Sequence, residues 1–364
     1  MTDATSLTTA LKALLEESIR RAGGWLPFDR FMAQALYAPG LGYYANDSRK
    51  FGAMPGSGSD FITAPEMSPL FGKALAVQVA DALDATGTDE VWEFGAGSGA
   101  LAKQLLEALG DKVKRYNIVE VSASLRERQE ELLRGDGGQR VAHPTWVSEL
   151  PDEIKGVVVG NEVLDAMPVK LLARVNGNWH ERGVGGSFEF ADRPTSLRPP
   201  IDIPGPHDYL TEIHPQAEAF IRTLADRLVQ GAAFFIDYGF SEREYYHPQR
   251  NMGTLMCHRG HMADTDPLSD IGLKDITSHV NFTGLAVAAG EAGLKTLGYT
   301  TQGRFLLNCG LAQQLADSPL ADRVAGQRLM LEHEMGELFK VIGFHRGDFW
   351  DAVGFREGDR THTL

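Results

Sequence analysis

The amino-acid sequence predicts an α/β fold with a mostly parallel sheet and helices on both faces. From residue 89 onward, short apolar runs alternate with helix-like segments, a rhythm typical of βαβ units. Three alternate glycines, Gly95, Gly97 and Gly99, stand between an apolar run and a helix-like run. The length of 364 residues exceeds one typical core, which predicts one large domain with appendages or two domains.

The amino-terminal part is expected to be helical, with helices over residues 7–21 and 27–37. Residues 38–68 are rich in Gly, Pro, Ser and aromatic side chains, which is typical of a lid or binding loop. A helix from about residue 66 to 86 follows. We therefore expect an amino-terminal helical and lid region over residues 1–75.

The core is expected over residues 76–310, with five apolar strands separated by helices. Two segments interrupt its rhythm and are expected to be insertions, near 176–210 and 241–283. The first begins as a hairpin around Asn176-Gly177-Asn178. A carboxy-terminal helical region is expected over residues 311–364, with 320–344 as one long helix or a bent pair. The expected strands are VWEF, YNIVEV, VAHPTWV, GVVVGNEV and AAFFIDYG.

The composition restricts the partners and the compartment. A formal charge of −14 disfavours nucleic acid, because an acidic chain repels phosphate backbones. Cys257 and Cys309 stand in no CxxC arrangement, which favours a reducing compartment. No apolar run approaches the roughly 18 residues of a membrane span, and the first residues lack the apolar core of a signal peptide. The cytoplasm is the expected location.

The glycine turn predicts a cofactor site. Gly95-Ala96-Gly97-Ser98-Gly99 follows a strand and precedes a helix, where glycines let a ligand approach the backbone. The first N–H groups of the helix can then bind an anionic group. The turn lacks the Lys-Ser/Thr pair of a nucleoside triphosphate site. The alternative is a turn that serves only tight strand–helix packing.

The position of Glu93 favours S-adenosylmethionine over NAD, which shares this layout. Glu120, followed by Val121 at the end of the next strand, can accept hydrogen bonds from two ribose hydroxyls in either cofactor. Glu93 lies two residues before the first glycine. A carboxylate there would repel a pyrophosphate but can face the ammonium of a methionyl group.

Five further segments follow one another along the chain: SDFITAPEMSPLFG, GNEVLDAMPV, IDYGF, GTLMCHRGHMADTDPL and LKDITSHVNFT. Taken together and in this order, they resemble the MidA-type family of S-adenosylmethionine-dependent methyltransferases. That family is related to the mitochondrial complex I assembly factor that dimethylates an arginine symmetrically. The resemblance covers roughly residues 25 to 310 and implies a class I, Rossmann-like methyltransferase fold with a donor site at the glycine turn. It also implies a protein arginine as acceptor, with a respiratory complex I subunit as first candidate.

The acceptor chemistry points to the residues after GVVVG. A guanidinium is a planar cation whose best partners are carboxylates that bind two of its N–H groups. Glu162 and Asp165 are three residues apart and would share a face of a first helical turn. We expect them to hold the guanidinium, while Asn161 orients donor or acceptor. The alternative is that Asn161 caps a helix whose dipole the acids complement.

Other residues are expected at the edges of the site. Thr63, Pro65 and Glu66 are expected near the methionyl end, or they cap and begin a helix. Adenine contacts are expected from Trp146, Ser148 and Glu149, although Trp146 can equally belong to the core. The acceptor channel is expected to include Asp237, Tyr238, His261 and His279, the alternatives being a buried tyrosine and a solvated polar face. No metal site is expected, because the spacing from Cys257 to Asp266 matches none.

Two other functions compete with the methyltransferase hypothesis. An NAD-dependent oxidoreductase would need a hydride-transfer acid/base pair such as Tyr-x-x-x-Lys, and none is evident. An assembly chaperone that keeps the cofactor fold without catalysis would bind the donor and tolerate changes at Glu162 and Asp165. A protein substrate is expected in the preferred hypothesis, and a homodimer through residues 241–283 is left open.

Overall fold

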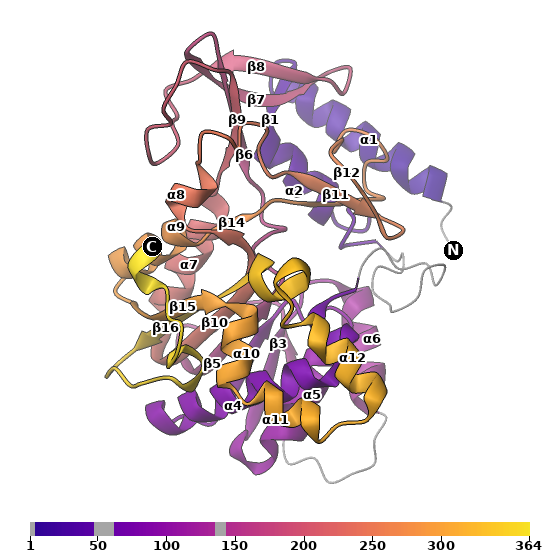
Figure 1. Ribbon diagram of the computed structural model, residues 1–364. Coiled ribbons are helices and arrows are strands. Elements are labelled where there is room, and N and C mark those ends of the chain that lie inside the picture. The colour runs from indigo at the N-terminus through magenta and orange to yellow at the C-terminus, as the bar shows by residue number, and fades with distance from the viewer. Residues whose placement is uncertain (1–3, 47–61, 135–142) are drawn as a thin grey trace. The chain divides into compact units, whose positions relative to one another are not determined.

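The computed structural model describes residues 4–46, 62–134 and 143–364, and the chain divides into two compact units (Figure 1). Unit 1 comprises residues 1–61, 164–218 and 240–284, and unit 2 comprises residues 62–163, 219–239 and 285–364. Residues 1–61 of the amino-terminal region therefore belong to the same unit as both expected insertions. Within the described ranges, every helix is too short or too polar to traverse a lipid bilayer.

Unit 2 is built on a mixed sheet in the order β15-β16-β10-β5-β2-β3-β4 (Figure 1). All neighbouring strands pair in parallel except β16, which is antiparallel to β10 and β15. The chain runs outward from β2 to β4 and returns to β5 on the other side of β2, so the strand order reverses there. Open α/β sheets bind ligands at such a reversal, beyond the carboxyl ends of the strands. The strands are β2 (Glu90–Phe94), β3 (Arg115–Val119), β4 (Pro144–Val147), β5 (Ile154–Asn161), β10 (Leu228–Phe240), β15 (Lys295–Thr301) and β16 (Phe339–Arg346).

Helices cover both faces of this sheet, as an α/β fold requires. On one face, buried side chains of α4 (Pro69–Thr86) and α5 (Ala100–Leu109) share a core with Val91 and Val157. On the other face, Phe220 of α7 (Pro215–Arg227) packs edge-on against Phe94 and Phe235, with ring centroids 5.1 and 5.7 Å apart. The remaining helices around the sheet are α3 (Ala64–Met67), α6 (Ala123–Arg134), α9 (Phe282–Glu291), α10 (Gln302–Asn308), α11 (Leu311–Ala316) and α12 (Leu320–Arg328).

The helix expected over residues 320–344 is wrong. Helix α12 ends at Arg328, a short π-helical segment spans Glu332–Gly336, and β16 begins at Phe339. The run FKVIGFHR is buried along almost its whole length between β10 and β15. A short apolar run cannot be assigned to helix or strand by periodicity alone, and here the pairing with two neighbouring strands decides.

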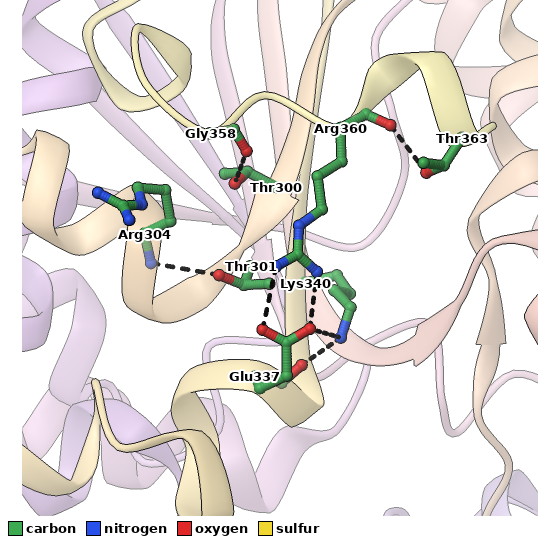
Figure 2. Close-up of polar contacts among 8 residues, drawn as sticks. All are labelled: Thr300, Thr301, Arg304, Glu337, Lys340, Gly358, Arg360 and Thr363. Atoms are coloured by element: carbon green, nitrogen blue, oxygen red, sulfur yellow. Dashed lines mark hydrogen bonds and ion pairs between the residues drawn. The ribbon is translucent and has the colours of Figure 1, made fainter.

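A cluster of hydrogen bonds joins the carboxy-terminal segment to residues at the end of β15 and near the start of β16 (Figure 2). The Arg360 guanidinium donates to both carboxylate oxygens of Glu337, at 2.7 and 3.3 Å. The ammonium of the buried Lys340 donates to the Glu337 carbonyl. Thr300 Oγ1 donates to the Gly358 carbonyl at 2.7 Å. These contacts lie within unit 2, to which residues 285–364 belong.

Unit 1 combines two antiparallel sheets with two amino-terminal helices and one short later helix. The expected hairpin is confirmed: β6 and β7 pair across Asn176 and Gly177, whose φ angles of 49° and 79° suit the tight turn. The amino-terminal helices pack against this unit in a core that includes Leu15, Phe31 and Leu171. The elements are α1 (Ala4–Arg21), β1 (Trp25–Pro27), α2 (Phe28–Tyr37), β6 (Lys170–Val175), β7 (Asn178–Gly185), β8 (Phe190–Pro194), β9 (Tyr209–Ile213), α8 (Glu242–Tyr245), β11 (Met256–Arg259), β12 (Met262–Asp264), β13 (Asp275–Thr277) and β14 (Val280–Asn281).

A buried carboxylate orders part of the irregular segment 241–283. Glu212 of β9 is fully buried and accepts hydrogen bonds from Tyr245 Oη at 2.8 Å and from the amides of Thr254 and Leu255 at 2.8 and 3.1 Å. Several donors on one carboxylate offset the cost of burying its charge. The hydrogen bonds to Glu212 therefore hold Tyr245, Thr254 and Leu255 of this segment in place.

Candidate functional site

The glycine turn follows β2, where the strand order of unit 2 reverses. Gly95, Gly97 and Gly99 have φ angles of 63°, 54° and 85°, which L-residues with side chains rarely adopt. A Cβ on Gly95 would lie 2.4 Å from Cγ1 of Val163, so this glycine also permits close packing. Helix α5 begins at Ala100 and presents its first N–H groups beside the turn. The buried Ala96 and half-buried Ser98 complete the turn.

Glu93 is buried beneath the turn. Its side chain is 1% exposed, and Tyr116 Oη of β3 donates to Glu93 Oε2 at 2.5 Å. Burial raises the pKa of this carboxyl to about 7, against the opposing effect of the Tyr116 hydrogen bond and with a smaller contribution from the charge of Glu120. A carboxylate held this way gains from a cation placed nearby.

A buried glutamine joins the turn to the ends of the next two strands. Gln129 of α6 donates through Nε2 to the Gly97 carbonyl at 3.0 Å and to Glu120 Oε2 at 3.1 Å. Its Oε1 accepts from Trp146 Nε1 at 2.8 Å. The other carboxylate oxygen of Glu120 accepts from the Ser122 amide at 2.8 Å. Gln129 thus sets the positions of three predicted cofactor residues.

Sequence reasoning did not single out Gln129, although a signal was present. Gln129 lies four residues from Leu125 and from Leu133, and all three are buried on one face of α6. A polar side chain within an apolar helical stripe needs a hydrogen-bonding partner in the interior. The acid at the end of the neighbouring strand was a natural candidate for that partner.

Replacing Gln129 by methionine is expected to weaken binding of S-adenosylhomocysteine about tenfold. Methionine fills a similar volume, but it makes none of the three hydrogen bonds that hold Gly97, Glu120 and Trp146. Calorimetric titration of both proteins measures the change. Gln230→Met is a matched control, because Gln230 is exposed and donates only to the Thr86 carbonyl among the described residues. Equal affinities for Gln129→Met and wild type would show that this network does not shape the site.

The residues expected to contact adenine lie after β4. Trp146 is half-buried against the core of unit 2, and the Arg126 guanidinium lies 5.9 Å from its ring centre. Ser148 and Glu149 are exposed in the bend that follows. Val121 follows Glu120 and is 78% exposed. Their contacts with adenine stay a prediction.

The expected cap at Thr63 is confirmed. The Thr63 amide donates to Glu66 Oε2 at 3.3 Å at the start of α3, and Pro65 lies in its first turn. The single helix expected from about 66 to 86 is instead two, because Ser68 ends α3 and caps α4. Gln104 of α5 donates to the Pro65 carbonyl at 2.7 Å, which joins α3 to the helix after the glycine turn. Of the expected lid, residues 47–61 lie outside the described residues.

Asn161 and Glu162 stand at the carboxyl end of β5, beside the glycine turn. Asn161 ends the strand and donates through Nδ2 to Glu162 Oε1 at 2.9 Å. Glu162 has a φ of 52°, and its amide donates to the Ile236 carbonyl of β10 at 2.9 Å. A side-chain-bearing residue at such a φ is strained, and such strain often accompanies function. Val163, the next residue, contacts the turn at Gly95.

The expectation that Glu162 and Asp165 share a helical turn is wrong. Residues 162–169 form turns and bends, because the left-handed φ of Glu162 prevents a helix from starting there. Asn161 is the last residue of a strand, so the alternative of a helix cap is wrong as well. Glu162 belongs to unit 2 and Asp165 to unit 1.

Asp165 belongs to a cluster of acids and tyrosines within unit 1. It is 6% exposed, and its carbonyl accepts from the Ser278 amide at 2.9 Å. The rings of Tyr37 and Tyr44 stack 5.6 Å apart, and Tyr44 Oη donates to Asp275 Oδ2 at 2.8 Å. Burial and then the charges of Asp275 and Asp165 raise the pKa of both tyrosines. Two carboxylates beside stacked rings form surroundings that favour a cation.

The four residues expected in the acceptor channel are divided between the two units. Asp237 and Tyr238 end β10 in unit 2, where Asp237 is fully buried and the Tyr238 ring packs on Phe339, 5.4 Å between centroids. His261 lies in unit 1, with a φ of 62° in the turn between β11 and β12. His279 also lies in unit 1, where its ring stacks on Phe240 at 5.1 Å. Their roles toward an acceptor stay predictions.

Comparisons with known proteins agree with this geometry. Residues 74–300 match a family model described as S-adenosyl-L-methionine-dependent methyltransferase. A crystal structure of a COG1565 superfamily member and candidate methyl transferase from Burkholderia thailandensis, bound to S-adenosyl-homocysteine, is 49% identical. It has a TM-score of 0.95 and covers 100% of this chain and 99% of that chain.

Curated relatives are similar over most of their length. The mitochondrial protein arginine methyltransferase NDUFAF7 of Danio rerio is 28% identical over 331 residues, which is 81% of this chain and 75% of that protein. Its Homo sapiens counterpart is 28% identical over 332 residues, with 81% and 72% covered.

Proposed function

Because the chain belongs to this family of S-adenosyl-L-methionine-dependent methyltransferases, we propose that it methylates an arginine side chain of a partner protein. The observation that carries the proposal is Glu162, a carboxylate held in a strained backbone at the end of β5, adjoining the glycine turn. The proposal also draws on the similarity to proteins named as arginine methyltransferases. A respiratory complex I subunit is the first candidate partner, as the resemblance to the MidA-type family implies.

The donor side of the proposal assigns roles within unit 2. When bound, S-adenosyl-L-methionine would supply a methyl group from its sulfonium, leaving as neutral S-adenosylhomocysteine, while the methylated guanidinium gives one proton to solvent. The first N–H groups of α5 would bind the methionyl carboxylate, and the buried Glu93 would face the methionyl ammonium. Glu120, held by Gln129, would accept hydrogen bonds from the ribose hydroxyls.

The acceptor side assigns Glu162 to the guanidinium. A carboxylate accepts two N–H hydrogen bonds from a guanidinium and so fixes its plane. Asn161 donates to Glu162 Oε1, which restricts the rotation of this carboxylate. A guanidinium fixed in this way directs one terminal nitrogen along a single line, as an in-line transfer from the sulfonium requires. Asp165 is proposed as a second carboxylate for the acceptor, from its own acidic and aromatic surroundings in unit 1.

Donor binding is expected to depend on pH through Glu93. The pKa of Glu93 is raised to about 7, so below this pH the carboxyl is neutral and attracts an ammonium weakly. Affinity for S-adenosylhomocysteine should therefore rise with pH up to about 7 and then level off, by at most about tenfold per unit. Calorimetry in a series of buffers from about pH 5.5 to about pH 8.5 measures this affinity.

Glu93→Gln is the control for this pH dependence. It should bind weakly at all pH values and remove the slope, because glutamine does not titrate. The same raised pKa stabilises the ligand-free protein below the ordinary value of 4.5, and this contribution is lost as the pH rises through about 7. A wild-type slope that persists in Glu93→Gln would assign the titration to another group.

The partner is tested by comparing complex I from cells with and without this gene product. Mass spectrometry of its subunits should find an arginine that carries methyl groups only when the protein is present. Restoring Glu162→Gln in place of wild type should leave that arginine unmodified. If the arginines of the complex I subunits carry the same methylation in both kinds of cell, a complex I subunit is not the partner.

The two competing hypotheses make different predictions. The match to the methyltransferase family and the S-adenosyl-homocysteine in a similar structure favour the methyl donor over NAD. A non-catalytic chaperone would support maturation of its client equally well with Glu162→Gln. The mass-spectrometric comparison therefore separates an enzyme from a chaperone as well.

A further inference from the structure

A small polar pocket lies within unit 1, apart from every residue proposed above for donor or acceptor. Its volume is about 180 Å³. Arg174 of β6 and Trp179 of β7 form one part of its lining, and the loop from Arg198 to Ile203 forms the rest. The pocket therefore combines two arginines with one aromatic ring.

Two of the three guanidinium nitrogens of Arg174 donate hydrogen bonds to carbonyls, and the third has no acceptor among the described residues. The residue is 8% exposed, with Nε donating to the His207 carbonyl at 3.2 Å and Nη1 to the Ile203 carbonyl at 2.8 Å. Its guanidinium lies 5.6 Å from the ring centre of Trp179. Nη2 is buried and has no hydrogen-bond partner among the described residues. A buried charged donor without an acceptor is costly, and a negative charge bound in the pocket would offset part of that cost.

Arg198 adds a second positive charge to the lining. Its Nη1 donates to the carbonyls of Thr195 and Leu197, at 2.9 and 2.7 Å, which anchors the side chain on its own loop. In the described part of the chain, no carboxylate lies within ion-pair distance of Arg174 or Arg198. Two arginines without acidic partners are notable in a chain with a net charge of −14. They attract anions locally.

The third charged residue of the lining limits the charge of the ligand. Asp202 also lines the pocket, so the lining carries two positive charges and one negative charge. A dianion such as phosphate would be repelled by Asp202, whereas a singly charged carboxylate fits the net charge of the lining. The Trp179 ring offers an apolar surface to the carbon atoms attached to such a carboxylate.

We propose that this pocket of unit 1 binds a single carboxylate group, with Arg198 as its donor and the guanidinium of Arg174 as a second positive charge. The carboxylate comes either from an acidic side chain of a polypeptide or from a free small acid, and both share this chemistry. The site does not depend on the proposed arginine methylation, because its residues and its binding assay involve neither donor nor acceptor.

Fluorine NMR of protein labelled with 5-fluorotryptophan tests the proposal. The Trp179 signal is assigned by its disappearance in Trp179→Phe, and it is followed during titration with N-acetyl-aspartyl amide, acetate and inorganic phosphate. We expect a saturable shift with both carboxylates and a weaker response to phosphate. Tighter binding of the peptide-like acid would identify a polypeptide source, and tighter binding of acetate a free small acid.

Variants make the test specific. Arg198→Gln should weaken carboxylate binding about tenfold, because it removes one charged donor. Arg174→Gln should weaken binding by a similar factor if the variant folds. Because Arg198 is exposed, Arg198→Gln is expected to fold, so it tests the proposal even if Arg174→Gln does not fold. Arg193→Gln is the matched control, since Arg193 lies over Trp25 at 4.6 Å and does not line the pocket. No saturable Trp179 shift, preferred binding of phosphate, or equal binding by Arg198→Gln and wild type would overturn the proposal.

Discussion

Replacing Glu162 by glutamine is expected to lower the rate of methyl transfer at least about hundredfold while leaving donor affinity within about twofold of wild type. Glutamine keeps the size and the backbone of Glu162, including the hydrogen bond that its amide donates to the Ile236 carbonyl. It loses the negative charge that binds a guanidinium and presents an NH₂ group that repels it. The effect should therefore appear in transfer, with little change in donor binding.

The measurement combines a transfer assay with labelled donor and calorimetry with S-adenosylhomocysteine. Glu153→Gln is the matched control, because Glu153 is an exposed acid of the same unit that lies just before β5 and pairs with Lys155 at 3.5 Å. The control should transfer methyl groups at the wild-type rate. Wild-type activity in Glu162→Gln would remove Glu162 from the acceptor site.

Gly95→Ala is expected to weaken donor binding about hundredfold and to destabilise unit 2. The added Cβ would lie 2.4 Å from Cγ1 of Val163, so either the turn or the residues after β5 must move. The φ of 63° is a second cost, because an alanine there is strained. The clash and the backbone strain would each disturb the glycine turn, and the clash would also displace the residues next to Glu162.

Gly87→Ala separates the strain from the clash. Gly87 ends α4 with a φ of 64°, almost equal to that of Gly95, but a Cβ there meets nothing within 4 Å. It should lower stability by about 1 kcal/mol and leave donor affinity unchanged. Thermal unfolding and calorimetry of both variants give the comparison. Equal donor affinities for the two variants would show that packing against Val163 does not support the site.

The sheet and the cofactor turn could be predicted because their signals are local. Gly95, Gly97 and Gly99 predict a turn with positive φ angles. The strand and the helix on either side of it are long and regular enough to be recognised from the sequence pattern. Glu93 could be singled out because a carboxylate two residues before such a turn would repel a pyrophosphate but can face an ammonium. The hairpin at Asn176-Gly177 is equally local, since both residues tolerate the backbone that the turn requires.

The rest depends on contacts between segments that are distant in the sequence. β16 is a strand because it pairs with β10 and β15, and its own residues are as compatible with a helix. The left-handed φ of Glu162 follows from the pairing of its amide with Ile236, about seventy residues later. The three hydrogen bonds of Gln129 join segments that periodicity treats separately. Spacing alone likewise could not assign Glu162 and Asp165 to different units.

The most direct test is to identify the amino acid that receives the methyl group. Purified protein is incubated with isotopically labelled S-adenosyl-L-methionine and an extract of the source cells lacking the protein, and the labelled proteins are hydrolysed to amino acids. The account predicts labelled methylarginine with wild type and none with Glu162→Gln. Label on another amino acid or on a small molecule, with unlabelled arginine, would contradict it.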